Sequence, residues 1–108
     1  MSDVLVRIKR AVLAGHYRFS LKASLEIEAD NLTELDVLES ILNAVAIYKT
    51  IRSTSPRRKS ATERLYVIQS TNLAGLPIYS KESWNAKRAK RCTIFSSLQR
   101  GPYRKVQW

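Results

Sequence analysis

The spacing of the apolar residues changes near residue 46, and this change constrains the fold more than any other feature of the sequence. Between residues 4 and 45 apolar residues recur every three to four positions, as in helices with one buried side. From residue 46 onward, short runs rich in β-branched and aromatic residues predict strands. Helices that precede strands indicate an α+β fold with an antiparallel sheet.

The first half predicts three helices. The first follows the apolar stripe Val4–Val12, with Ser2 as its N-cap and Gly15 just after its last turn. The segment His16–Phe19 alternates and predicts a short strand or an extended link.

The other two helices have clear start signals. Ser20 caps the second, which Asn31 ends, and Thr33 with Asp36 resembles a capping box at the start of the third. The third helix, with its apolar positions between 37 and 45, has the best amphipathic pattern in the chain.

The second half predicts three or four antiparallel strands, and Pro77 must lie at a strand start or on a sheet edge because it cannot donate to a ladder. The 108 residues form one domain, in which residues 101–108 are a tail or an added strand. We expect strands at 46–51, 65–69, 76–80 and 92–96, loops at 53–60 and 85–90, and a turn at 72–75.

Charge divides the chain as sharply as periodicity does. Residues 1–46 hold five Lys and Arg against seven Asp and Glu, whereas residues 47–108 hold fourteen bases against two acids, for a total of +10. A concentrated positive field attracts phosphate backbones, so RNA is the expected partner; the alternative is a solvated basic surface without a ligand. The candidate RNA-binding residues are Arg52, Arg57, Arg58, Lys59, Lys87, Arg88 and Arg91.

The scarcity of Cys and His restricts the chemistry. One Cys and one His cannot hold zinc, so we expect neither a metal nor any other cofactor. The single Cys fits a reducing compartment, no apolar run approaches the roughly 20 residues that span a bilayer, and Asp3 stands where a signal peptide carries positive charge. These features predict a cytoplasmic protein without a membrane partner.

Lys, Arg and Tyr remain as reactive groups in the strand region. RNA cleavage without metal needs a base for the 2′-hydroxyl, a cation for the developing charge and an acid for the leaving 5′-oxygen. Lys and Tyr can act as base or acid when neighbouring cations lower their pKa, whereas Arg can only stabilise charge. Solvated bases and packed tyrosines are the alternative. Aromatic residues that could stack on bases, or simply pack on the helices, are Tyr66, Tyr79, Trp84, Tyr103 and Trp108.

Six short segments of the chain match a known family: Gly15–Ala23, Leu32–Val37, Ile41–Asn43, Tyr48–Ile51, Ile78–Lys81 and Thr93–Ser97. They resemble the RelE-like type II toxin superfamily, including its motility quorum-sensing regulator toxins. The resemblance spans roughly residues 5 to 98.

This resemblance implies two or three helices on a curved antiparallel sheet, and a toxin that cleaves mRNA, either free or on the ribosome, until an acidic antitoxin binds it. Lys49 and Tyr79 match active-site positions of the family. Its terminal-strand Lys has no clear equivalent, Arg100 being the nearest substitute, and the usual His before Ala is Lys22. The candidate catalytic residues are therefore Lys49, Tyr79, Lys81 and Arg100. A non-catalytic RNA- or ribosome-binding module and a domain that binds an acidic antitoxin-like chain are the alternatives.

Overall fold

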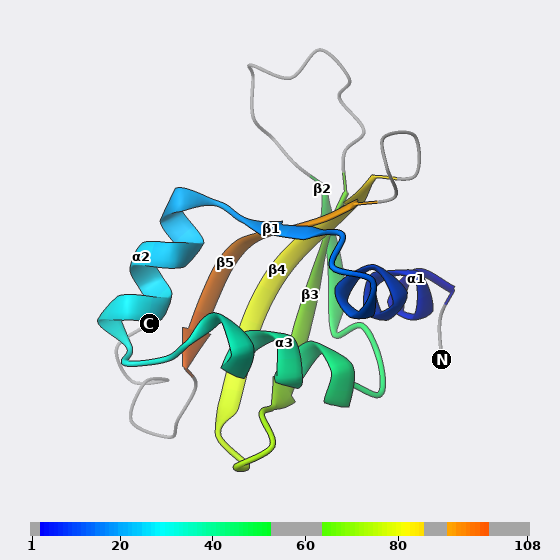
Figure 1. The fold of residues 1–108 in the computed structure, drawn as a ribbon. Helices are drawn as coiled ribbons and strands as arrows, with labels where there is room; N and C mark the ends of the chain where they lie inside the picture. Colours follow the sequence, from blue (N-terminus) through cyan, green and yellow to red (C-terminus); the bar gives the residue numbers. More distant parts are fainter. Residues whose placement is uncertain (1–2, 53–63, 86–90, 100–108) are drawn as a thin grey trace.

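The computed structural model describes residues 3–52, 64–85 and 91–99, and these form an α+β fold. Three helices lie against one side of a five-stranded sheet whose strand order is β1-β5-β4-β3-β2 (Figure 1). The elements are α1 (Asp3–Leu13), β1 (Tyr17–Phe19), α2 (Leu21–Ala29), α3 (Glu34–Asn43), β2 (Lys49–Arg52), β3 (Arg64–Thr71), β4 (Pro77–Asn85) and β5 (Arg91–Gln99).

The α+β prediction is confirmed, but the expected sheet of three to four antiparallel strands is wrong in two respects. The sheet has five strands, and β1 lies parallel to β5 with Tyr17 beside Cys92 and Phe19 beside Ile94. The short segment before α2 is therefore an edge strand that separates two helices. Its partner lies near the other end of the sequence, and local periodicity carries no information about such a pairing.

The predicted helix boundaries follow from caps that the structure contains. Gly15, with a φ of 79°, follows α1 in the left-handed conformation that glycine tolerates. The hydroxyl of Ser20 accepts from the amide of Ala23 at 3.1 Å and so caps α2. Thr33 and Asp36 form a complete capping box at the start of α3, with each side chain bonded to the other residue's amide. Ser2, the expected cap of α1, lies outside the described residues.

The sequence predicts the positions of the strands more accurately than the residues at which they begin and end. β4 begins at Pro77, as expected, but continues to Asn85 instead of ending at Ser80. Lys81 and Glu82 continue the strand, and Glu82 is fully buried within it. β2 begins only at Lys49 and ends at Arg52.

The core fills the space between the helices and one side of the sheet. From the helices it takes the apolar stripes of α1 and α3, including Leu5, Ile8 and Ile41, which are fully buried. The sheet contributes every second residue of its central strands, because successive strand side chains point to opposite faces. These residues are Ile68, Ile78, Cys92 and Ile94, with Tyr66 and Trp84 packed against them.

Candidate nucleic-acid interface

The sheet has a second face, which points away from the three described helices. We call it the outer face and assign residues to it by strand alternation and by their absence from the helix-side core. Its described members, joined in register across the sheet, are Arg18, Lys49, Ile51, Leu65, Val67, Gln69, Tyr79, Lys81, Ser83 and Thr93.

Two of the candidate catalytic lysines lie in one row across this face. Lys49 pairs with Val67, and Val67 pairs with Lys81 on its other side. Two strand spacings separate the lysine backbones, which is about 10 Å. Lys49 is exposed and Lys81 partly exposed, while Val67 between them is completely buried. The row thus presents two cations on either side of an apolar centre.

Tyr79 lies on the same face, two residues before Lys81, and pairs with the exposed Gln69. Only 9 % of Tyr79 is exposed, so its ring is part of the buried centre of this face rather than a projecting group. The structure therefore brings Lys49, Tyr79 and Lys81 together from β2 and β4. Arg100, the fourth candidate catalytic residue, lies outside the described residues.

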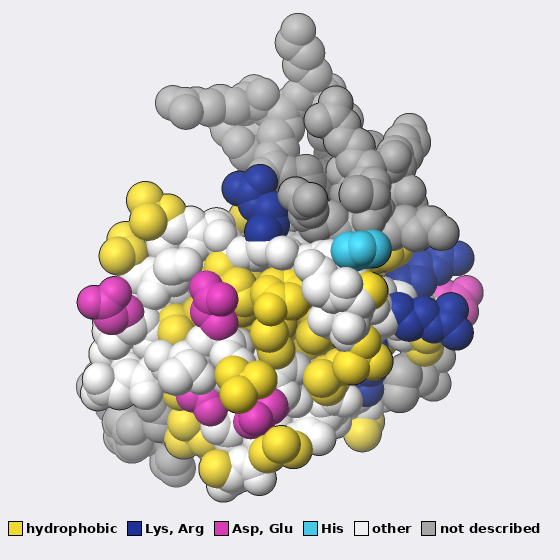
Figure 2. Space-filling view, in the orientation of Figure 1, with side chains coloured by type: hydrophobic (Ala, Val, Ile, Leu, Met, Phe, Trp, Pro, Cys, Tyr) yellow, Lys and Arg dark blue, Asp and Glu magenta, His cyan; other side chains and the backbone are white. Residues whose placement is uncertain are grey.

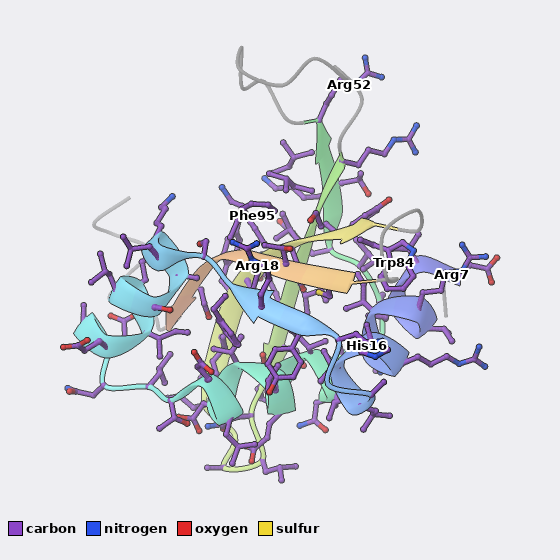
Figure 3. The ribbon with its side chains drawn as sticks, turned by 45° about the horizontal axis from the view of Figure 1, so that its top comes forward. Arg7, His16, Arg18, Arg52, Trp84 and Phe95 are labelled. Atoms are coloured by element: carbon purple, nitrogen blue, oxygen red, sulfur yellow. The ribbon has the colours of Figure 1, made fainter. Side chains whose placement is uncertain are left out.

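The outer face also includes Arg18, which is not among the site residues predicted from the sequence. Tyr17 and Phe19 turn toward the core and meet edge to face, with ring centroids 6.0 Å apart. Arg18, between them, points the other way, and it is exposed beside Thr93 of β5 (Figure 3). The segment His16–Phe19 alternates in the sequence. Had it been assigned to the sheet, this alternation would have placed Arg18 on the face opposite to Tyr17 and Phe19.

An irregularity in β5 shapes the same region. Lys81 pairs with Ser96 and Glu82 with Ile94, so that Phe95 is the extra residue of a β-bulge. Ser20 fixes this bulge: its hydroxyl donates to the carbonyl of Phe95 at 3.1 Å and its amide to that of Ile94 at 2.9 Å.

Of the predicted RNA-binding residues, the described part of the chain includes only Arg52 and the backbone of Arg91. Arg52 alternates with Ile51 and so belongs to the helix side, at the end of β2, where it stands exposed and directly opposite Arg64. The backbone of Arg91 pairs with Asn85. The residues outside the described part of the chain are Arg57, Arg58, Lys59, Lys87 and Arg88.

The predicted stacking aromatics also divide between the two faces. Tyr66 and Trp84 pack against the helix-side core, and Tyr79 lies on the outer face. Tyr103 and Trp108 lie outside the described residues.

Helices α2 and α3 and the outer face of the sheet carry charges of opposite sign. Residues 21–43, which include α2 and α3, contain six Asp and Glu against one Lys. Figure 2 shows acidic side chains over the left and lower parts of the helical side, with bases at its upper and right margins. The outer face, by contrast, contributes only basic ionisable groups besides its tyrosine, namely Arg18, Lys49 and Lys81.

The most perturbed carboxyl of the described chain lies beneath the sheet and not on its outer face. Glu82 is fully buried, and this burial raises its pKa from 4.5 to about 8, although a hydrogen bond from Ser80 at 3.3 Å acts in the opposite direction. Its Oε2 has no hydrogen-bond partner among the described residues. Burial, and then the nearby Glu82, raise the pKa of the Cys92 thiol, which keeps it an unreactive core group.

Comparisons with models of known families, with curated proteins and with solved structures found no match to this chain. Within the described ranges, no helix is long and apolar enough to cross a membrane. The same ranges contain no cluster of three or more His, Cys, Asp or Glu side chains that could hold a metal ion.

Proposed function

We propose that this chain binds RNA on the outer face of its sheet and cleaves it without metal, as a toxin of a type II toxin–antitoxin pair. The observation that carries the proposal is the meeting of Lys49, Tyr79 and Lys81 on that one face. Their selection from the sequence did not depend on any knowledge of strand pairing. Tyr79 and Lys81 share a face by alternation, so the support comes from the register of β2 against β3, which places Lys49 on the same face.

The charge distribution supports RNA as the ligand. Arg18 adds a third cation to the outer face, and no acidic residue lies there among the described positions. Cations without neighbouring acids neutralise phosphates and release counterions, which favours binding in proportion to their number. The acidic α2 and α3 would repel the same backbone, so RNA is expected to approach from the sheet side.

Each residue has a distinct expected role in cleavage. One of the lysines removes the proton of the 2′-hydroxyl, whose oxygen then attacks phosphorus, and the other cation stabilises the charge that forms on the phosphorane. Tyr79 orients the phosphate or donates the proton that the departing 5′-oxygen takes up. Arg100 adds charge stabilisation. The products are a 2′,3′-cyclic phosphate and a free 5′-hydroxyl.

The burial of Tyr79 favours a second candidate, a non-catalytic RNA- or ribosome-binding module. Because only 9 % of Tyr79 is exposed, its phenol group is poorly placed to contact a phosphate. In such a module the cations hold phosphates, and each contributes a similar small share of the affinity.

A cleavage and binding assay on the same RNA separates the two candidates. End-labelled RNA is incubated with the protein in EDTA, and the variants Lys49→Ala, Lys81→Ala and Tyr79→Phe are compared with Arg10→Ala. Arg10→Ala removes an exposed cation of α1, away from the outer face. A ribonuclease cuts the RNA and leaves cyclic phosphate ends, loses this activity in the first three variants while still binding, and keeps it in Arg10→Ala.

The other outcomes are equally informative. Binding without cleavage, weakened slightly and alike by each lysine substitution, would favour the binding module. A failure of the wild-type protein to bind or cut RNA would overturn both candidates. In a bacterial host, growth arrest with cleaved transcripts, relieved by the Lys49→Ala, Tyr79→Phe double variant and by a co-expressed acidic antitoxin, would establish the toxin role.

A further inference from the structure

An aromatic ring lies on the outer face at the β5 bulge. Phe95 is the unpaired residue of this bulge, because Glu82 pairs with Ile94 and Lys81 with Ser96. Phe95 directly follows the core-side Ile94, so strand alternation places its side chain on the outer face. Phe95 is partly exposed and is absent from the hydrophobic residues packed against the core.

Helix α2 fixes the position of this ring. Besides the two bonds from Ser20 to the carbonyls of Ile94 and Phe95, the carboxylate of Glu26 accepts the amide of Ser97 at 3.0 Å. The backbone on both sides of the bulge is therefore tied to one helix. The bulge is held in place by these three hydrogen bonds from outside the sheet.

Cations lie on the strands to either side of Phe95. Arg18 is on β1, beside Thr93, and Lys81 is on β4, beside Ser96. Figure 3 shows Arg18 and Phe95 near one another on the upper side of the sheet, away from α3. An apolar ring between two cations suits a ligand that carries an apolar aromatic plane next to negative charges. A nucleotide with an unpaired base has this composition.

We propose that Phe95 is a stacking platform for one unpaired base of single-stranded RNA, while Arg18 and Lys81 hold the phosphates on either side of that base. The proposal deepens the RNA-binding function above and rests on it. It selects single-stranded over duplex RNA, because paired bases are stacked within the helix and offer no free face to the ring.

The test compares short fluorescently labelled oligouridine with an abasic oligonucleotide of the same length, over a range of salt concentrations. Stacking adds affinity without releasing counterions, whereas a phosphate contact changes the salt slope. Phe95→Leu is expected to weaken oligouridine binding about 5- to 100-fold at an unchanged salt slope, with little effect on the abasic strand. Arg18→Ala should lower the slope by about one for both strands.

Two further measurements keep the test decisive. Phe95→Tyr retains an aromatic plane and should restore most of the affinity that Phe95→Leu loses, while Arg10→Ala should bind as the wild type does. If Phe95→Leu does not fold, the affinities of the wild type for the oligouridine and the abasic strand still show whether a base adds to binding. Equal binding of both strands by the wild type, or of oligouridine by wild type and Phe95→Leu, would overturn the stacking role and leave RNA binding standing. Absence of any RNA binding by the wild type would overturn both proposals.

Discussion

The buried carboxyl of Glu82 makes the stability of this protein depend on pH in a way that one substitution should remove. Below pH 4.5 the group is protonated in the folded and the unfolded chain and has no net effect. Between 4.5 and about 8 the unfolded chain ionises while the folded one keeps its proton, so the free energy of unfolding falls as pH rises. Above about 8 both states are ionised, and the loss is complete.

The size of the effect follows from this interval. At about 1.4 kcal/mol for each pH unit, the range from 4.5 to about 8 gives a loss of at most about 5 kcal/mol. Small domains have total stabilities of only about 5–15 kcal/mol, so this loss is a large share of the free energy of unfolding. Glu82→Gln keeps the shape of the protonated side chain without a proton to lose. It should match the wild type at pH 4.5 and exceed it by several kcal/mol at pH 9.

Urea unfolding monitored by circular dichroism at pH 4.5, 6, 7.5 and 9 provides the measurement. Glu28→Gln, which changes an exposed carboxyl of α2, is the matched control and should follow the wild type throughout. The difference between wild type and Glu82→Gln isolates the one group, because all other titrations are common to both. Parallel stability profiles for these two proteins would refute the reasoning, as they would mean that Glu82 ionises normally in the folded state.

Three other outcomes are expected. Asp36→Ala should destabilise the protein by about 1 kcal/mol at pH 7. The effect should vanish in acid, because the amide of Thr33 holds the Asp36 pKa below its usual 3.8 and this stabilisation is lost as pH falls through the lowered value; thermal melts at pH 7 and pH 2.5 check it. Ser20→Ala should lower the free energy of unfolding by about 1–2 kcal/mol, because it removes both the cap and the bond to the bulge. The control Ser24→Ala should lower it by less than about 0.5 kcal/mol. A Ser20→Ala variant as stable as the wild type would contradict the anchoring of the bulge. The thiol of Cys92, which is fully buried, should react with a coloured thiol reagent only in urea; rapid reaction of the native protein would contradict its burial.

Local features of the fold were predictable, and pairings over long distances were not. The caps at Gly15, Ser20 and Thr33 act within a few residues, and their signals stand in the sequence itself. The parallel pairing of β1 with β5 depends on a partner that no local pattern names. The end of β4 was missed because a charged residue inside a strand normally argues against burial, whereas Glu82 is buried in a form whose raised pKa favours the neutral acid.

The candidate site, too, was predictable only where its residues lie close together in the sequence. Tyr79 and Lys81 share a face in any strand, so their proximity could be expected from alternation alone. That Lys49 joins them depends on the register of β2 against β3, which the structure supplies. The face of Phe95 also follows from alternation with Ile94, but its position near Arg18 depends on the parallel pairing of β1 with β5, which the structure supplies.

The pairing of β1 with β5 also has a consequence for how the chain acquires its shape during synthesis. The bond between Ser20 and Phe95 closes a separation of 75 residues, and α2 packs chiefly on the strand that contains Phe95. At synthesis rates of about 5–20 residues per second, α1, β1 and α2 wait for several seconds on the ribosome before their partner strand exists. During that interval the apolar side of α2 has no native surface to cover it. A nascent chain of this kind is expected to bind chaperones until β5 emerges, and then to complete its sheet in one cooperative step.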